Sequence, residues 1–577
     1  MILKNICALI VVAAGLGSVA NAEPIYVKQG NDWSPELRQK FYTQDQGSRL
    51  MPAAWLRALK TADGKPFLHD SLARYGYLPM PGRSGADAGL PVGFTTNDKG
   101  KETAIGMSCG ACHVREIEVG GMAYRIDGGP AIVDFQNLMA DLDDATQTVL
   151  KDKDAFLEFA DAVLGKGASG SEIDALRADF IVWTNRFHTI TVGSLPEKEW
   201  GPSRLDALSM IINRLGGLDI GPADNDGIIE ENIAVANAPA RYPFLWNAAK
   251  QDFTQWPGFL PNGNDLFGLV RNLGEVYGVF ADFRPHDKDG VFFNRDYLKE
   301  NSANWNGLLK LENWLKDMGS PRWPWALDTE LAAQGETVFN LATEDGGCAE
   351  CHAKQKGAFR SIFEETWKTT VTDVGTDVAE CMVIARTLKT GVMEGATVPF
   401  SSPMPAEAPA VSVLGTAVVG AILQNSLTLV EDGLADDLES LLHGGSEDKH
   451  EFLARHKDLF SAFGGKSAAA GDGGKCKYEG RVLDGIWAAA PYLHNGSVPT
   501  LVDLLKKPAD RPASFKVGPS YDVEKVGLAA EQTKFDFTIE TTGCDQLASG
   551  DSRCGHDYGT SLNDQQKKAL IEYLKSI

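Results

Sequence analysis

The chain has 577 residues, with 78 acidic and 55 basic side chains and a formal net charge of −23 at pH 7. Because phosphate binding needs a basic surface, this charge argues against a nucleic acid as partner. The acidity could steer a basic redox partner, although solubility alone also accounts for it. The length suggests several domains, or a two-domain core with long insertions and room for a substrate pocket.

Residues 1–22 have the pattern of a secretory signal peptide. Lys4 supplies the positive start, residues 6–19 are mostly apolar, and Ala20-Asn21-Ala22 is a small-residue cleavage site. No other stretch is long and apolar enough to span a bilayer. We therefore expect a soluble, exported protein that begins near Glu23, in the periplasm of a Gram-negative bacterium or released further out.

Residues 23 to about 100 show few periodic signals, and the pentapeptide Cys109-Gly-Ala-Cys112-His113 follows them. A second copy is Cys348-Ala-Glu-Cys351-His352. Chance would give about 0.002 copies of CxxCH in a chain of this composition. Two cysteines at this spacing bind the vinyl groups of one porphyrin, and the histidine is the proximal ligand of its iron.

The alternatives for each motif are a redox CxxC pair and half of a zinc site. A histidine directly after both pairs, in a chain with an export signal, argues against them. The sequence therefore predicts two covalently bound haem c groups, with iron on His113 and His352.

The segment after His113 alternates apolar and polar residues on both sides of Gly120-Gly121, which predicts a β-hairpin. Arg125, on the second strand, could pair with a haem propionate and so bind the cofactor. A surface salt bridge explains an arginine there equally well.

Helical patterns dominate afterwards, over residues 130–144, 155–164, 171–187 and 204–215. A Pro/Trp cluster at residues 321–325 suggests a domain boundary near residue 325. Residues 329–341 then read as the first helix of a cytochrome c fold, in which Gly335 permits close crossing by the last helix. Asn563 and Gln566 form a capping box for that last helix, and residues 444–474 look like a polar loop.

We therefore predict a mainly α protein with two cytochrome c-like haem domains, long insertions and few short β-hairpins. Residues 23–325 would form the N-terminal haem domain, with an N-terminal extension, and residues 326–577 the C-terminal cytochrome c domain.

The nine cysteines can be assigned to the signal peptide, to haem attachment and to disulfides. Cys7 leaves with the signal peptide, four cysteines hold haem, and an even number remains in an oxidising compartment. Two disulfides are predicted, of which Cys544–Cys554 would close a short loop and Cys381–Cys476 a long one. Four cysteines allow three pairings, and free buried thiols are the alternative.

The sixth ligand of each iron decides its function, because a filled position transfers electrons and an open one can bind O₂ or peroxide. For the second haem, His556 is favoured, since it lies in the loop before the last helix; His494 and Met404 are alternatives. No histidine occurs between Val114 and Phe187, so the first haem could have an open distal site.

The chain resembles the di-haem c-type cytochrome peroxidase superfamily, and most closely its branch of haem rubber oxygenases and di-haem fatty-acid dioxygenases. The resemblance covers most of the mature chain and includes these blocks: Gln46-Gly47-Ser48-Arg49-Leu50-Met51-Pro52, Gly89-Leu90-Pro91-Val92-Gly93-Phe94, Tyr124-Arg125-Ile126-Asp127-Gly128-Gly129-Pro130, Gly485-Ile486-Trp487-Ala488-Ala489-Ala490-Pro491-Tyr492-Leu493-His494-Asn495-Gly496 and Gly555-His556-Asp557-Tyr558-Gly559.

The resemblance implies that the haem on His113 is the active one, so that His113 serves catalysis as its proximal ligand. The haem on His352, with a distal histidine, would transfer electrons or support the structure. The peroxidase branch has a displaceable histidine shortly after the first CxxCH, and this chain has none there.

The leading hypothesis is a periplasmic di-haem dioxygenase that uses O₂ to oxidise a double bond, or its allylic position, in an unsaturated fatty acid or polyisoprenoid. Aromatic residues are candidates for an apolar distal pocket, with core packing as their alternative role: Phe244, Trp246, Phe253, Trp256, Phe259 and Phe280.

Two other functions stay open. A cytochrome c peroxidase would reduce H₂O₂ with electrons from a small redox protein and would need a distal acid or base. A non-catalytic two-haem electron carrier or redox sensor would have six-coordinate iron at both sites.

Overall fold

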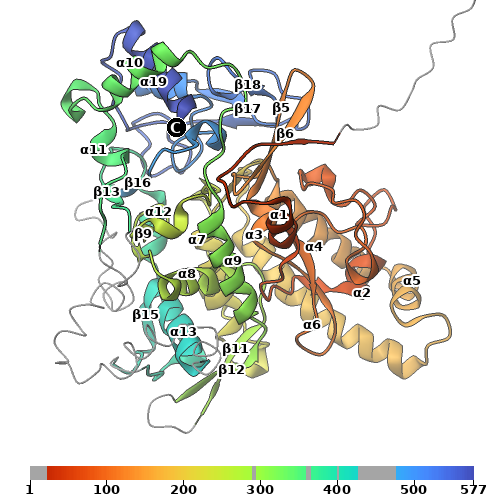
Figure 1. The fold of residues 1–577 in the computed structure, drawn as a ribbon. Helices are drawn as coiled ribbons and strands as arrows, with labels where there is room; N and C mark the ends of the chain where they lie inside the picture. The colour runs from red at the N-terminus through yellow and green to blue at the C-terminus, as the bar shows by residue number, and fades with distance from the viewer. Residues whose placement is uncertain (1–22, 289–293, 359–365, 399–401, 426–475) are drawn as a thin grey trace, which may run out of the picture.

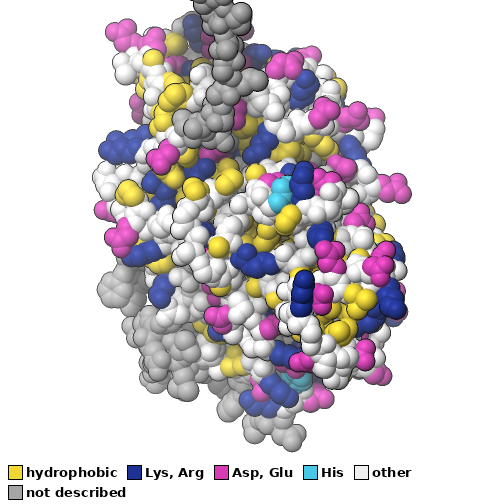
Figure 2. Space-filling view, turned by 90° about the vertical axis from the view of Figure 1, so that its right-hand side faces the viewer, with side chains coloured by type: hydrophobic (Ala, Val, Ile, Leu, Met, Phe, Trp, Pro, Cys, Tyr) yellow, Lys and Arg dark blue, Asp and Glu magenta, His cyan; other side chains and the backbone are white. Residues whose placement is uncertain are grey.

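The computed structural model describes residues 23–288, 294–358, 366–398, 402–425 and 476–577 (Figure 1). The predicted signal peptide, Cys7 and the polar loop at 444–474 lie outside the described residues. Within them, no helix combines the length and the apolar composition that crossing a membrane requires. On the face shown in Figure 2, acidic and basic side chains are interspersed over the described surface.

The N-terminal region places the first CxxCH between two small sheets. In one sheet β4 lies between β2 and β3, and in the other β6 lies between β1 and β5. The predicted hairpin is confirmed, because Val119 pairs with Met122 across the glycine turn. The elements are β1 (Ile25–Tyr26), α1 (Pro35–Thr43), β2 (Met51–Pro52), α2 (Ala53–Ala58), β3 (Phe94–Asn97), β4 (Ala104–Met107), α3 (Cys109–Cys112), β5 (Val114–Val119) and β6 (Met122–Asp127).

The predicted helices are present with shifted bounds. They are α4 (Phe135–Lys151), α5 (Lys153–Leu164), α6 (Gly170–Ser194) and α7 (Ala207–Arg214), and a π-helical turn (Leu215–Asp219) continues α7. α7 begins later than expected, since Arg204 and Leu205 form β7 (Arg204–Leu205) against β8 (Ala240–Arg241). Asp206 then caps the helix by accepting a hydrogen bond from the Ser209 amide at 2.9 Å.

The middle of the chain packs long helices around one apolar cluster that contains residues of α7, α8, α9 and α13. Its elements are β9 (Phe253–Thr254), β10 (Leu260–Pro261), α8 (Asp265–Gly278), β11 (Phe283–Asp287), β12 (Arg295–Asn301), α9 (Trp305–Asp317), α12 (Ala379–Ile384), β14 (Thr387–Lys389), β15 (Glu407–Pro409) and α13 (Ala410–Gln424).

The C-terminal region brings the first and last of its helices together, as Figure 1 shows at the top of the molecule. Its elements are α10 (Thr329–Phe339), α11 (Ala349–His352), β13 (Thr370–Thr372), β16 (Tyr478–Gly480), α18 (Leu501–Leu504), β17 (Ser514–Lys516), β18 (Tyr521–Asp522), β19 (Gly527–Leu528), β20 (Thr538–Glu540) and α19 (Asp564–Ser576).

The crossing of α10 and α19 depends on Gly335. A Cβ atom there would lie 2.0 Å from the carbonyl oxygen of Ala569, so only glycine fits without movement. The capping box of Asn563 and Gln566 at the start of α19 is confirmed. The small residue Gly335 therefore correctly predicted, from the sequence alone, a contact between two helices far apart in the chain.

Residues on both sides of the expected boundary at 325 share one apolar core. This cluster contains Ile117 and Trp246 together with Val338 and Leu570. The Trp323 ring, within the Pro/Trp cluster, packs edge-on against Trp487, with 5.3 Å between ring centres. Both predicted disulfides, Cys381–Cys476 and Cys544–Cys554, are present.

Candidate haem sites

The first CxxCH borders a cavity between α3, α7 and α8. Cys109, Cys112 and His113 all line it. Nδ1 of His113 donates a hydrogen bond to the carbonyl oxygen of Pro243 at 2.9 Å, since a carbonyl can only accept. This bond fixes the ring and leaves Nε2 for a metal, as is usual for ligating histidines. Burial lowers the pKa of His113 to about 4, which keeps the imidazole in its neutral, metal-binding form.

The rest of this cavity is partly apolar and partly ionisable. Leu208 and Ile211 of α7 and Trp256 form apolar walls, whereas Arg271 and Glu275 of α8 carry ionisable groups. Among the residues that the structure describes, His113 is the only histidine that lines this cavity. Of the six aromatic candidates, Phe244 and Trp256 line it and the other four do not.

The second CxxCH borders a separate cavity, lined by Cys348, Cys351 and His352. His352 is held like His113, because its Nδ1 donates to the carbonyl oxygen of Arg481 at 2.7 Å. His556 lines the same cavity, with 6.1 Å between the centres of the two imidazole rings. Two metal–nitrogen bonds of about 2 Å, plus about 1 Å from each nitrogen to its ring centre, give about 6 Å. The spacing of His352 and His556 therefore fits one iron between them.

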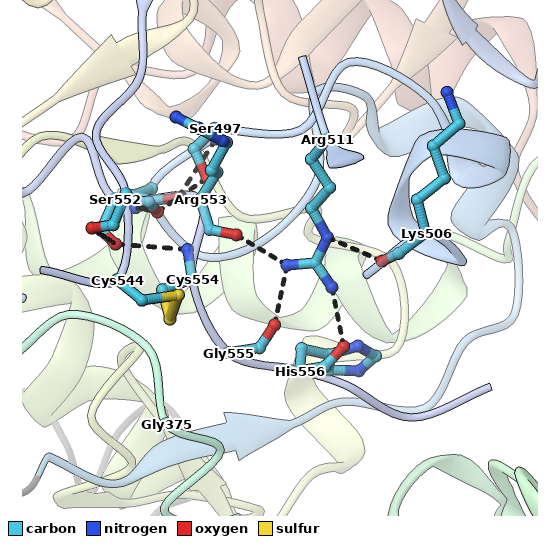
Figure 3. The surroundings of a disulfide bond; sticks show 12 residues. Gly375, Ser497, Lys506, Arg511, Cys544, Ser552, Arg553, Cys554, Gly555 and His556 are labelled. Atoms are coloured by element: carbon cyan, nitrogen blue, oxygen red, sulfur yellow. Dashed lines mark hydrogen bonds between the residues drawn. A yellow bond between two sulfur atoms is a disulfide. The ribbon is translucent and has the colours of Figure 1, made fainter. Parts of the chain in front are cut away.

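His556 is positioned through its backbone. Its carbonyl oxygen accepts a hydrogen bond from Arg511 at 2.9 Å, and its amide donates to Val374 at 2.8 Å. Figure 3 shows Arg511 reaching the carbonyls of Arg553, Gly555 and His556 beside the Cys544–Cys554 disulfide. Burial lowers the pKa of His556 to about 3, so this ring is also neutral.

The two alternative ligands lie elsewhere. His494 lines the second cavity, but its Nε2 lies 2.9 Å from a carboxylate oxygen of Asp377 and its ring stacks on Tyr478. Met404 belongs to the apolar cluster around α8 and α13 and is not among the residues lining the cavity. The geometry supports His556.

Arg125 lies outside both cavities. Its guanidinium forms an ion pair with Glu116 at 2.6 Å, directly across the hairpin. The structure gives no support to a propionate partner at this position and agrees with the salt-bridge alternative, although the pair is largely buried.

Of the residues that separate the two cavities, sequence reasoning named Phe244 and Trp256 and missed the three charged ones. Arg241, Phe244, Trp256, Glu479 and Arg481 line both of them. Arg241 is buried and donates to the carbonyl oxygen of Leu493 at 3.0 Å, and desolvation lowers its pKa to about 9. An anionic group in either cavity would compensate this charge, as a haem propionate would. Arg241, Glu479 and Arg481 belong to no local motif, so the sequence offered no signal for these three residues.

Each of the two cavities is lined by a CxxCH motif with an oriented histidine, which are the residues that would hold a haem c. The family described as RoxA-like, cytochrome c-like matches residues 477–516, which include β16 and the turn around His494. This match supports haem c as cofactor and a haem c oxidoreductase as the class of protein.

Two relatives come from Sinorhizobium fredii. The uncharacterized protein y4iJ is 27% identical over 608 residues, which cover 95% of this chain and 92% of y4iJ. The uncharacterized protein y4iM is 38% identical over 117 residues, or 17% of this chain and 27% of y4iM.

Proposed function

We propose that this protein is an exported, periplasmic di-haem dioxygenase, with one haem c on His113 and one on His352. The observation that carries the proposal is an asymmetry among the described residues. The second cavity holds two facing histidines 6.1 Å apart, and the first holds one. When bound on His113, the haem would supply an iron that activates O₂.

The chain's own residues would bind and orient the haem and the substrate and shield them from water. Pro243 sets the orientation of His113 through its carbonyl, and Leu208, Ile211 and Trp256 offer apolar contacts to a long unsaturated substrate. Arg241 and Arg481 would hold haem propionates between the cavities. An unsaturated fatty acid or polyisoprenoid suits these walls, and a small redox protein could exchange electrons at the second haem.

Peroxide reduction is the second candidate, favoured by one observation. Glu275 lines the first cavity, accepts a hydrogen bond from Gln255 at 3.2 Å, and burial raises its pKa. A carboxyl group in this place could serve as the acid or base that a peroxidase needs. The electron-carrier hypothesis requires a sixth ligand at both irons. No second histidine lines the first cavity within the described chain, so that ligand would have to be Met107 or Met210.

Turnover assays separate these functions. We expect the haem-loaded protein to consume O₂ with oleate, linoleate or polyisoprene and to yield oxygenated or cleaved products. Glu275→Gln should retain this activity. If the protein instead reduces H₂O₂ with a cytochrome donor, and Glu275→Gln slows that reaction roughly 100-fold, the protein is a peroxidase.

A further inference from the structure

A buried carboxyl group that none of the above roles uses faces the first cavity. Glu380 lies on α12, is 4% exposed and lines the cavity with Cys109, Cys112 and His113. Within the described parts of the chain, its Oε2 atom is buried without a hydrogen-bond partner. Its backbone position is fixed, since the next residue forms the Cys381–Cys476 disulfide.

The surroundings of Glu380 disfavour a negative charge. Asp206, Asp377 and Glu479 act on it electrostatically and, after burial itself, raise its pKa well above the usual range. The nearby arginines have other partners. Arg481 lies 3.6 Å from Glu479, and Arg386 donates to Asn213 at 2.9 Å. An ionised Glu380 would be a buried charge without compensation, which is costly.

Two other acidic groups near the first cavity have the partners that Glu380 lacks. Asp206 accepts hydrogen bonds from the amides of Ser209 and Ala238, both at 2.9 Å. Glu275 accepts from Gln255. Glu479 also lines the cavity and has a buried Oε2 without a hydrogen-bond partner in the described chain, but Arg481 lies 3.6 Å from its other carboxylate oxygen. Glu380 is therefore distinguished by its burial, its free oxygen and its acidic neighbours together.

We propose that Glu380 stays a neutral carboxylic acid and donates a hydrogen bond to a small oxygen ligand, O₂ or peroxide, in the first cavity. A protonated carboxyl offers an O–H donor, and the donors of a distal pocket decide how oxygen ligands bind and react. This assignment rests on the proposed function, because it needs a first haem with an open position.

Infrared spectroscopy of the haem-loaded protein with carbon monoxide as probe tests the assignment. We expect a carboxylic-acid C=O band at pH 7 that disappears in Glu380→Gln and persists in Glu275→Gln. The C–O stretch of bound carbon monoxide should rise in Glu380→Leu, which removes the donor, and shift less in Glu380→Gln, whose amide can still donate.

Two outcomes would overturn the assignment. If the first haem binds carbon monoxide but the acid band is missing or survives in Glu380→Gln, Glu380 is not the neutral donor, and the proposed function stands. If neither haem binds carbon monoxide, the proposed open site is wrong, and the role of Glu380 is lost with it. Glu380→Gln conserves shape, so the band test holds even if Glu380→Leu does not fold.

Discussion

The guanidinium carbon of Arg481 lies 4.3 Å from the centre of the Phe244 ring, and the two residues connect the segments that hold the proximal histidines. Phe244 follows Pro243, whose carbonyl binds His113, and the carbonyl of Arg481 binds His352. A side-chain contact between two distant parts of the chain thus connects the backbone groups that orient His113 and His352, the histidines of the two proposed haem sites.

Replacing Arg481 with lysine should disturb both sites. Lysine keeps the charge but cannot stack as a plane on Phe244, so we expect a loss of roughly 1 kcal/mol of stability. The midpoint potential of the second haem should also shift. Arg177→Lys is the matched control, because Arg177 stacks on Phe156 at 4.6 Å and lines neither cavity. Redox titration of both variants measures this shift. Equal midpoint potentials of the second haem in the two variants would contradict a role for Arg481 at that haem.

Substitution of Gly335 tests the helix crossing. Gly335→Ala would place a methyl group against the Ala569 carbonyl, and we expect it to cost roughly 1–3 kcal/mol. Gly170→Ala, at the start of α6 with no atom within 4 Å of the added Cβ, should be neutral or slightly stabilising. Thermal unfolding of both variants checks this, and equal midpoints would show that α10 and α19 can separate freely.

The disulfides should differ in their contribution to stability. Chain entropy predicts a loss of roughly 4–5 kcal/mol for Cys381→Ala/Cys476→Ala, which opens a sequence separation of 95 residues. The same relation gives roughly 3 kcal/mol for Cys544→Ala/Cys554→Ala, with a separation of 10. Denaturant unfolding of the double variants measures both losses, and the reverse order would refute the entropic explanation.

Asp206 makes stability depend on pH. Burial raises its pKa to about 6, so the folded protein binds this proton more tightly than the unfolded chain does. The stability that this proton adds to the fold is fully present below the unfolded pKa of about 4. It is lost as the pH rises through 6. Relative to Asp206→Asn, the wild type should therefore lose roughly 3 kcal/mol between pH 4 and pH 7. Urea unfolding at both pH values measures this, and parallel pH profiles would contradict it.

Local patterns predicted the parts of the molecule that local interactions decide. The two CxxCH motifs, the Asn563 cap and the glycine turn of the hairpin each act within a few residues. That turn also sets the register that places Glu116 opposite Arg125, so the ion pair could have been predicted from the sequence.

The partition between the cavities could not be predicted in this way. Arg241, Glu380 and Arg481 come from three segments far apart in the sequence, and no local pattern around any of them marks a cavity residue. Only the folded chain brings them to the cavities, where burial shifts their pKa values. The start of α7 was wrong for a related reason, since Arg204 and Leu205 pair with a distant strand.

We infer that the two proposed haem sites differ, with His556 as a second iron ligand only at the site of His352. Electron paramagnetic resonance of the purified ferric protein, together with His556→Ala and His494→Asn, tests it most directly. We expect one high-spin and one low-spin haem in the wild type, two high-spin haems in His556→Ala, and no change of spin state in His494→Asn. Two low-spin haems in the wild type, or a low-spin signal that survives in His556→Ala, would contradict it.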